Sequence, residues 1–536
     1  MRQENPPTKN AKRPREAAPL PTAKDVVAKL HQSVTTQQRL AILEQVKFRL
    51  ESCMERPQLC NTMLGSGIIN ALCLQLGFVL NRKESTKKEV ECICQVISII
   101  YRNAEAKDRD SSISMIGLEL FNLLLKAISW SVRFPILSIF HLASGTSQGT
   151  TTLFKTSKLL SSLVDILEEE FIESDNLMEI LGILKNLSYF GEDHRLQIVE
   201  CPGLIAQLCG QVCKKKDEER LSEKFSAILR NLAVSPCTRK AMVRQSMLLN
   251  AIIQMGSHSN KQITRNILNC CVSLGQDAES CSVISLHGDG IFWNLMKRYM
   301  MNETDSTIRK RSARVVRLLA SASAACSHDK VLIKALSHRA LNDISNDVRT
   351  EATDALVKLS ESVAAPMPHH ELILDALTHL ASSPTAILET LASAIKMQAS
   401  HPSNRSVMAE RKMLLQSVAR IALSSEATNA CKEDACRAIL YLSELESNRA
   451  KIVSTNSILE ALVQNSSGRY HIEEQDKRQL YAIQTLVKLA STSSNRKMMA
   501  SYNRLLQTLV QYASSSPPGD TKADVKRVIL WLVSEL

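Results

Sequence analysis

The sequence predicts an all-α fold, a right-handed α-solenoid of about ten stacked helical repeats. A similar apolar pattern returns roughly every forty-odd residues. From Asp25 onward apolar residues follow a helical period, and no convincing run of alternating strand residues occurs. A repeat of this length cannot bury its apolar side alone, so neighbouring repeats must stack and share one elongated core.

The repeat is clearest around three arginines, Arg405, Arg449 and Arg496, whose surroundings align without gaps. In each copy an apolar residue follows three positions later, and an apolar pair follows nine and ten positions later. Arg195 and Arg239 begin fainter copies with the same offsets. We expect the recurring arginine to cap or salt-bridge the turn between repeats; binding a ligand is the less favoured role.

Composition excludes several classes of protein. The 536 residues include only 16 Gly and 15 Pro, and aromatic residues are 4%. Such scarcity argues against β-sandwiches, propellers and Gly-rich nucleotide loops. No stretch approaches the ~18–20 apolar residues of a membrane span, and the polar N-terminus does not resemble a signal peptide. We therefore expect a soluble, cytoplasmic and/or nuclear protein without membrane association.

The chain divides into three expected segments. Residues 1–24 are rich in Pro, Lys and Arg and predict a disordered basic tail. Residues 25–84 predict an N-terminal helical cap, and residues 85–536 predict the repeats. In the tail, Lys12, Arg13 and Arg15 resemble a monopartite nuclear localisation signal; a chance basic cluster is the alternative.

A second motif marks one helix of each repeat. "GILKNLSYF" and "AILRNLAVS" share an apolar pair, one further residue and then Asn186 or Asn231, and in the similar "NILNCCVSL" Asn269 directly follows the apolar pair. The same frame continues through seven further segments, centred on His141, Leu318, Lys358, Met397, Tyr441, Lys488 and Trp531. We name these ten positions the reference positions. Between repeats, "SGTSQGTT", "AAPMPHH" and "SSSPPGD" predict loops.

These units resemble armadillo repeats, in which a short first helix begins near Asn-Arg, as in Asn448-Arg449. A second helix follows, and a long third helix ends in Leu-x-Asn-Leu, here residues 184–187. Residues 345–359 are more similar to the related HEAT type. The resemblance implies that third helices line a concave groove, where Asn186, Asn231 and Asn269 can hydrogen-bond an extended peptide.

One armadillo subfamily does not fit. Importin-α-like adaptors carry a Trp four residues before the reference Asn, where this chain has Gly182, Ala227 and Arg265. The expected partner is therefore not a basic signal peptide.

Catalytic motifs are missing from the sequence. It contains no GxxxxGK[ST], GxGxxG, HExxH, GxSxG or CxxC pattern, and its fifteen cysteines are scattered among apolar residues. We expect a non-enzymatic protein with no cofactor, metal or small-molecule substrate.

The expected groove is basic. We took three slots per repeat: the reference position, the residue before it and the residue four before it. Ten of these thirty slots are basic and one, Asp354, is acidic. A basic stripe attracts acidic or phosphorylated protein segments. The predicted binding residues are Lys185, Asn186, Arg230, Asn231, Arg265, Asn269, Arg314, Arg317, Lys358, Lys396, Arg437 and Lys488.

Two alternatives remain at this point. The long basic side chains could simply cover the third helices with their aliphatic stems. The net charge of +12 also allows RNA or ribonucleoprotein binding, although few aromatic residues are available to stack on bases. A scaffold or adaptor that binds an acidic protein segment is the favoured function.

Overall fold

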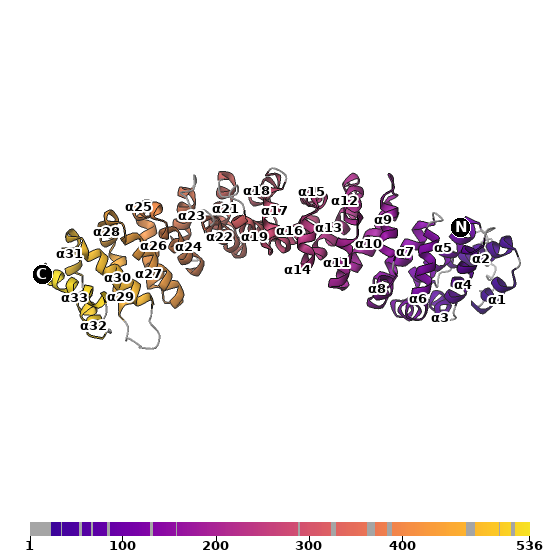
Figure 1. Ribbon diagram of the computed structural model, residues 1–536, viewed down its shortest axis with the longest axis horizontal. Helices are drawn as coiled ribbons and strands as arrows, with labels where there is room; N and C mark the ends of the chain where they lie inside the picture. The colour runs from indigo at the N-terminus through magenta and orange to yellow at the C-terminus, as the bar shows by residue number, and fades with distance from the viewer. Residues whose placement is uncertain are drawn as a thin grey trace, which may run out of the picture. The chain divides into compact units, whose positions relative to one another are not determined.

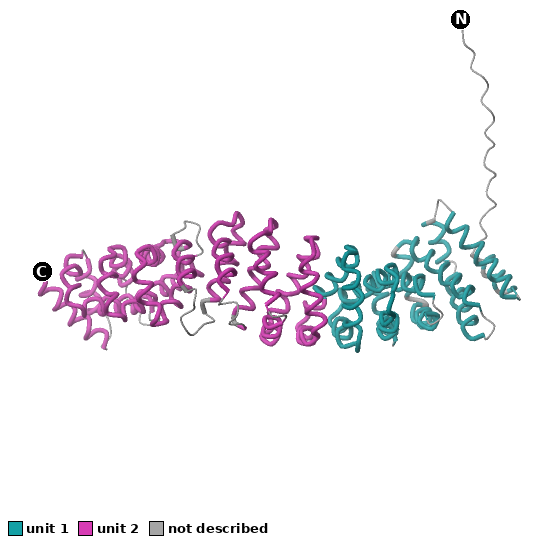
Figure 2. The backbone as a smooth tube through the Cα atoms, turned by 90° about the horizontal axis from the view of Figure 1, so that it is seen from above, with its two compact units in different colours: residues 1–231 teal, residues 232–536 magenta. Residues whose placement is uncertain are grey.

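A computed structural model describes residues 23–536, apart from 34, 53–55, 66–67, 83–85, 129–131, 157, 288–289, 323–328, 362–369, 383–387, 468–476, 503 and 516–519. The expected nuclear signal at Lys12, Arg13 and Arg15 lies outside the described residues. The chain forms two compact units, residues 1–231 and 232–536 (Figure 2). The expected segment boundaries at 24 and 84 remain predictions.

All regular elements of the described residues are helices (Figure 1). Those that begin in unit 1 are α1 (Ala23–Gln32), α2 (Thr36–Ser52), α3 (Arg56–Gly65), α4 (Ile68–Leu80), α5 (Lys87–Asn103), α6 (Ala106–Ile128), α7 (Arg133–Ser144), α8 (Ser147–Phe154), α9 (Leu159–Leu167), α10 (Ser174–Phe190), α11 (Glu192–Glu200), α12 (Leu204–Lys214) and α13 (Glu219–Val234).

Unit 2 continues with α14 (Pro236–Val243), α15 (Ser246–Gly256), α16 (Lys261–Leu274), α17 (Ala278–Leu286), α18 (Ile291–Asn302), α19 (Ser306–Leu319), the short 3₁₀ helix η1 (Ala320–Ala322), α21 (Lys330–Asn342), α22 (Asn346–Glu361), α23 (His370–Ser382), α24 (Leu388–Ser400), α25 (Pro402–Glu410), α26 (Lys412–Leu423), α27 (Asn429–Ser443), α28 (Glu446–Val453), α29 (Asn456–Ser466), α30 (Lys477–Ser491), α31 (Ser493–Ala500), α32 (Leu505–Ser515) and α33 (Asp520–Val533).

Helices of the same kind stack in rows within each unit. In unit 2 each of the third helices α16, α19, α22, α24, α27, α30 and α33 packs against the next. The second helices α15, α18, α21, α23, α26, α29 and α32 form a parallel row of neighbours. In unit 1, α7 packs between α5 and α10. This arrangement is an α-solenoid, as the repeating apolar pattern predicted.

The repeating apolar positions form the core. Met408, Ile452 and Met499, three residues after the aligned arginines, are fully buried. The pair Ile458 and Leu459 is also buried between neighbouring helices. The repeating pattern therefore records which residues each repeat packs against the next.

One expected loop is largely helical. "SGTSQGTT" spans residues 144–151, but α8 begins at Ser147, so the prediction was wrong for most of this segment. The Thr146 hydroxyl caps α8 by accepting a hydrogen bond from the Gly149 amide at 3.1 Å. A Cβ at Gly149 would lie 2.0 Å from the Ala143 carbonyl oxygen, so glycine permits the close approach of α8 to α7. The glycine that suggested a loop is a packing residue.

Most described cysteines are buried within the helices, as their apolar surroundings predicted. Burial raises the pKa of the Cys73 and Cys209 thiols to about 12. Cys237 is the exposed cysteine among those described. In the described part of the chain, no single helix has the length and apolarity needed to cross a membrane, although three bent helix pairs pass that test by length and composition.

Candidate functional site

The recurring arginines fasten each first helix to the end of the third helix before it. Arg449 donates from Nε to the Ser443 carbonyl oxygen at 2.8 Å, and Arg405 does the same to Ala399 at 3.0 Å. Arg195, Arg239 and Arg496 bond equivalent carbonyls at the ends of α10, α13 and α30. These carbonyls have no partner within their own helix, and a cation is favoured at a helix C-terminus. The expectation that the recurring arginine caps the inter-repeat turn is confirmed.

The asparagine before the arginine strengthens the same connection. Asn448 is fully buried and donates from Nδ2 to the Leu442 carbonyl at 3.1 Å. Asn404 and Asn495 bond Gln398 and Leu489 in the same way. The Asn-Arg pair is therefore structural, and the candidate site must be sought on the third helices.

Two of the expected peptide-binding asparagines contact the neighbouring third helix. Nδ2 of Asn186 donates to the His141 carbonyl at 3.4 Å and to Ser144 Oγ at 3.0 Å. Nδ2 of Asn231 donates to the Lys185 carbonyl at 3.4 Å and to Ser188 Oγ at 3.2 Å. Their amide groups thus tie third helices together. Peptide binding by Asn186, Asn231 and Asn269 remains a prediction.

The same hydrogen bonds correct the reference frame on α7. His141 and Ser144 occupy the places that Lys185 and Ser188 occupy one repeat later. His141 therefore stands one position before the reference position, which is Leu142. Its imidazole fills the space beside Gly182, where a Cβ would lie 2.3 Å from His141 Nε2. No side chain could stand at 182 without displacing His141.

Three of the expected binding cations pair with carboxylates of the next repeat. Arg317 Nε lies 3.2 Å from Glu351 Oε2, and Lys396 Nζ lies 2.7 Å from Asp434 Oδ1. Arg265 pairs with Asp305, whose carboxylate also caps α19. Part of the basic excess is therefore neutralised within the fold.

Other expected cations differ in their surroundings. Lys185 and Arg314 are exposed and Lys488 is half-buried, and the charged group of none of the three has an ion-pair or hydrogen-bond partner among the described residues. Arg230 donates to the neighbouring Asn231 Oδ1 at 3.1 Å, and Lys358 is exposed on α22. Of these residues, Lys185, Arg314 and Lys488 have no neighbouring carboxylate partner among the residues that the structure describes.

Arg437 belongs to an arginine–aromatic cluster on α27 and α30. Its guanidinium lies 5.5 Å from the Tyr441 ring centroid and 5.4 Å from that of Tyr481. Nε of Arg437 also donates to the Tyr441 hydroxyl at 2.9 Å. Both tyrosine rings are thus engaged with a cation of the chain itself.

The sequence frame missed one position that the structure makes important, seven residues before the reference position. Glu179, Glu351, Asp434, Lys224 and Tyr481 stand there. This position lies two helical turns before the reference position and on the same helix face, so the frame could have been extended to it. Because Glu179, Glu351 and Asp434 stand at this position, leaving it out of the frame exaggerated the excess of basic residues on the third helices.

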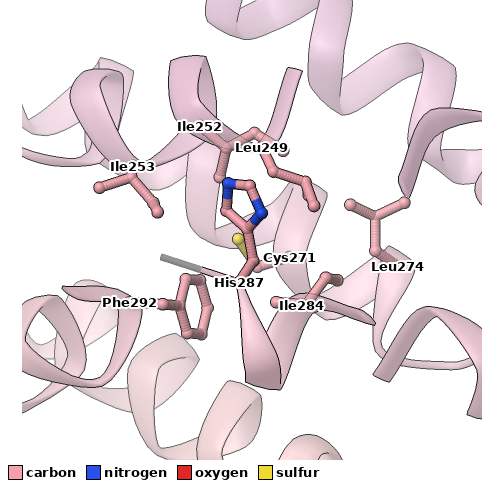
Figure 3. A pocket seen from close by; sticks show the side chains of 8 residues that line it. All are labelled: Leu249, Ile252, Ile253, Cys271, Leu274, Ile284, His287 and Phe292. Atoms are coloured by element: carbon pink, nitrogen blue, oxygen red, sulfur yellow. The ribbon is translucent and has the colours of Figure 1, made fainter. Parts of the chain in front are cut away.

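The described cavities do not resemble a catalytic site. A unit 2 cavity of about 10 Å³ is lined by Leu249, Ile252, Ile253, Cys271, Leu274, Ile284, His287 and Phe292 (Figure 3). It can hold about one water molecule. A unit 1 cavity of about 230 Å³ lies among α8, α9 and α11, with Thr156, Ser161 and Gln197 as its polar lining. Cys271 and His287 both line the unit 2 cavity, but burial raises the pKa of the Cys271 thiol to about 12, and His287 Nε2 bonds Asn250 Oδ1 at 2.8 Å. Neither lining includes a pair of carboxylates.

Metal binding has no candidate cluster. Among the described residues, no group of three or more His, Cys, Asp or Glu side chains is placed to hold a metal ion. The third-helix residues predicted from the sequence remain the candidate site.

Comparison with known proteins identifies the fold. No family model and no curated protein sequence matches the chain. A structure from a study of a phosphorylation switch that controls the interaction between cadherin and beta-catenin matches 96% of this chain and 99% of its own, with a TM-score of 0.63 and 13% identity. An engineered protein matches 78% of this chain and 98% of its own, with a TM-score of 0.55 and 16% identity.

A computationally designed armadillo repeat protein for modular peptide recognition matches 47% of this chain and 99% of its own, with a TM-score of 0.40 and 15% identity. The chain has the armadillo-like α-solenoid fold, as its sequence motifs predicted, and no specific member is indicated.

Proposed function

We propose that this protein is a non-catalytic scaffold or adaptor that holds an extended, acidic or phosphorylated segment of a partner protein along its third helices. The observation that carries the proposal is that Lys185, Arg314 and Lys488 lie on third helices without a partner among the described residues. Fixed cations on a rigid surface attract anionic segments and orient them. Catalysis has no assembled residues to support it in the described cavities.

The likeness to the structure from the cadherin and beta-catenin study adds support of a different kind. That study concerns an interaction controlled by phosphorylation, and the fold matched is an armadillo-like solenoid. A partner segment whose negative charge is regulated would suit the unpaired cations of this chain.

RNA binding is the alternative, favoured by Tyr441 and Tyr481 on neighbouring third helices. Aromatic rings beside cations can stack unpaired bases. Arg437, however, already lies over both rings, and Arg317 and Lys396 are neutralised by carboxylates. The protein partner is therefore the better-supported proposal.

The test is a charge reversal that spares the ion pairs. In the variant Lys185→Glu/Arg314→Glu/Lys488→Glu we expect affinity for a fluorescent poly-glutamate peptide to fall at least about tenfold, measured by anisotropy at fixed salt. The control reverses three exposed lysines on or beside first and second helices, Lys158, Lys330 and Lys497. Equal losses in both variants would refute a third-helix site, and preferential binding of single-stranded RNA would favour the alternative.

A further inference from the structure

Three steps between neighbouring third helices share an ion pair in the same register. The cation stands one residue before the reference position, and the carboxylate stands seven residues before the reference position of the next helix. Arg317–Glu351 and Lys396–Asp434 follow this rule in unit 2. In unit 1, His141 Nδ1 lies 2.5 Å from Glu179 Oε2, in the corrected frame of α7. We name this arrangement the ion-pair ladder.

The step between α10 and α13 has no ion pair at these two positions. Here the first position is Lys185 and the second is Lys224, so two lysines face each other. The register is unchanged, because Asn231 bonds the Lys185 carbonyl and Ser188 Oγ just as Asn186 bonds His141 and Ser144. Lys224 therefore stands beside Lys185 as Glu179 stands beside His141.

Burial and two nearby charges act on Lys224. Burial lowers the pKa of Lys224; the negative charge of Glu179 opposes this effect, and the positive charge of Lys185 adds to it to a smaller extent. Glu179 is itself bonded to His141. Neither Lys185 nor Lys224 donates a hydrogen bond to any residue that the structure describes. Like charges thus meet at this step, whereas the three ion-paired steps place opposite charges at the same two positions.

We propose that Lys185 and Lys224 form a seat for the phosphoryl group of a phosphoserine or phosphothreonine in the bound segment. A phosphoryl group carries about −1.5 to −2 charges near neutral pH and three acceptor oxygens, so one group can neutralise both lysines. A carboxylate carries one charge and would leave one lysine uncompensated. This inference rests on the proposed function and adds to it the place where the phosphoryl group of the partner segment binds.

A nucleic acid fits this seat less well. Its backbone presents regularly spaced phosphates and needs a continuous row of available cations. At the preceding step of the ion-pair ladder, between α7 and α10, His141 is already paired with Glu179. The charges of Lys185 and Lys224 therefore form one small site, which suits a single phosphorylated side chain better than a row of backbone phosphates.

The first experiment measures binding to the full-length protein. The probes are a Gly-Ser peptide with one phosphoserine, its serine and glutamate counterparts, and inorganic phosphate. We expect the phosphopeptide to bind at least about tenfold more tightly than either counterpart and than inorganic phosphate. Its binding should also raise the pKa of Lys224, followed by NMR of protein labelled at lysine Cε and assigned with Lys224→Arg.

The decisive variant is Lys224→Glu, which completes the ladder by pairing with Lys185. It should abolish the preference for phosphopeptide while leaving thermal stability equal to or above that of the wild type, so lost binding cannot be attributed to unfolding. Lys224→Arg should retain the preference. The matched converse is Asp434→Lys, which places a second cation opposite Lys396 and should create a new phosphopeptide site.

The outcomes separate this inference from the function on which it rests. If the wild type binds the poly-glutamate peptide but shows no preference for phosphopeptide, or if Lys224→Glu binds the phosphopeptide normally, the seat is refuted and the scaffold proposal stands. If the wild type binds neither peptide, the proposed function fails. Inorganic phosphate that binds as tightly as the phosphopeptide, or RNA that displaces it at equal concentration, also overturns the seat.

Discussion

Arg309 grips the carboxylate of Asp343 with two hydrogen bonds, from Nε at 2.6 Å and from Nη2 at 2.8 Å. The Arg309 side chain is 9% exposed and that of Asp343 is fully buried. Nη1 of Arg309 also donates to the Glu303 and Thr304 carbonyls, which lie between α18 and α19. This pair therefore links α19 to the connection that precedes it and to the connection between α21 and α22.

Replacing Arg309 should destabilise unit 2 strongly. In Arg309→Met the buried Asp343 carboxylate loses its principal partner, and we expect the free energy of unfolding to fall by about 3–5 kcal/mol. Urea denaturation followed by circular dichroism measures the change. The control Lys310→Met removes a more exposed pair with Asp347, which should cost about 0–1 kcal/mol. Similar losses in both variants would contradict the role of burial.

Asp343 should also make stability depend on pH. Burial alone raises the pKa of Asp343, but hydrogen bonds from Arg309 and the Ser345 amide, together with the charges of Arg309 and Arg339, lower it below its usual value. Because the folded-state pKa is lower than the unfolded value of about 3.9, the stabilisation is complete above that pH and is lost as pH falls through the folded-state pKa.

The check is urea denaturation of wild type and Asp343→Asn at pH 7 and at progressively lower pH. The variant should be less stable at pH 7, and the difference should shrink as pH falls below about 4. A difference that stays constant or grows on acidification would show that the carboxylate charge is not what stabilises this connection.

Removal of a recurring arginine should weaken one repeat. Arg449 bonds the Ser443 carbonyl and, through Nη1, Ser491 Oγ at 2.9 Å. Arg449→Ala leaves these groups without this partner and should cost about 1–3 kcal/mol. Lys451→Ala on the same helix removes only an exposed pair with Glu410 and serves as the control. Calorimetry that shows equal melting temperatures for the two variants would argue against a capping role.

Charge introduced between repeats should unfold the affected repeat. Leu459 on α29 is 1% exposed, so Leu459→Asp buries an unpaired carboxylate in the shared core. We expect loss of helical circular dichroism or a markedly lower melting temperature. Gln464→Asp places the same charge on the exposed side of α29 and should leave the melt nearly unchanged. A native melt for Leu459→Asp would disprove the assignment of Leu459 to the core.

The sequence predicted the solenoid because its apolar period and its Asn-Arg pair are direct consequences of repeat stacking. Leu459 and Arg449 therefore have the environments expected of them. The charge of the third helices was predicted less well. Whether Arg317 is available depends on Glu351, which lies 34 residues away on the next third helix, and the three slots of the sequence frame did not include this position.

The residue of α7 that occupies the reference position was also predicted incorrectly from the sequence. His141 directly follows the apolar pair Ile139-Phe140, and its contact with Asn186 places it one residue before the reference position. A shift of one residue is invisible to an averaged period but decides which side chains meet across neighbouring helices. The like-charged pair of Lys185 and Lys224 could therefore be recognised only once the register was known.

The Asn448-Arg449 pair bonds backbone carbonyls at the end of the previous repeat, and every amino acid supplies a backbone carbonyl. Substitutions at Leu442 or Ser443 leave these acceptors in place, so the connection survives divergence of the residues it binds. Repeats joined in this way can be duplicated, deleted or exchanged during evolution without a matching change in the neighbouring module. This indifference to side-chain identity gives a physical reason why the architecture is recognisable at 13% identity.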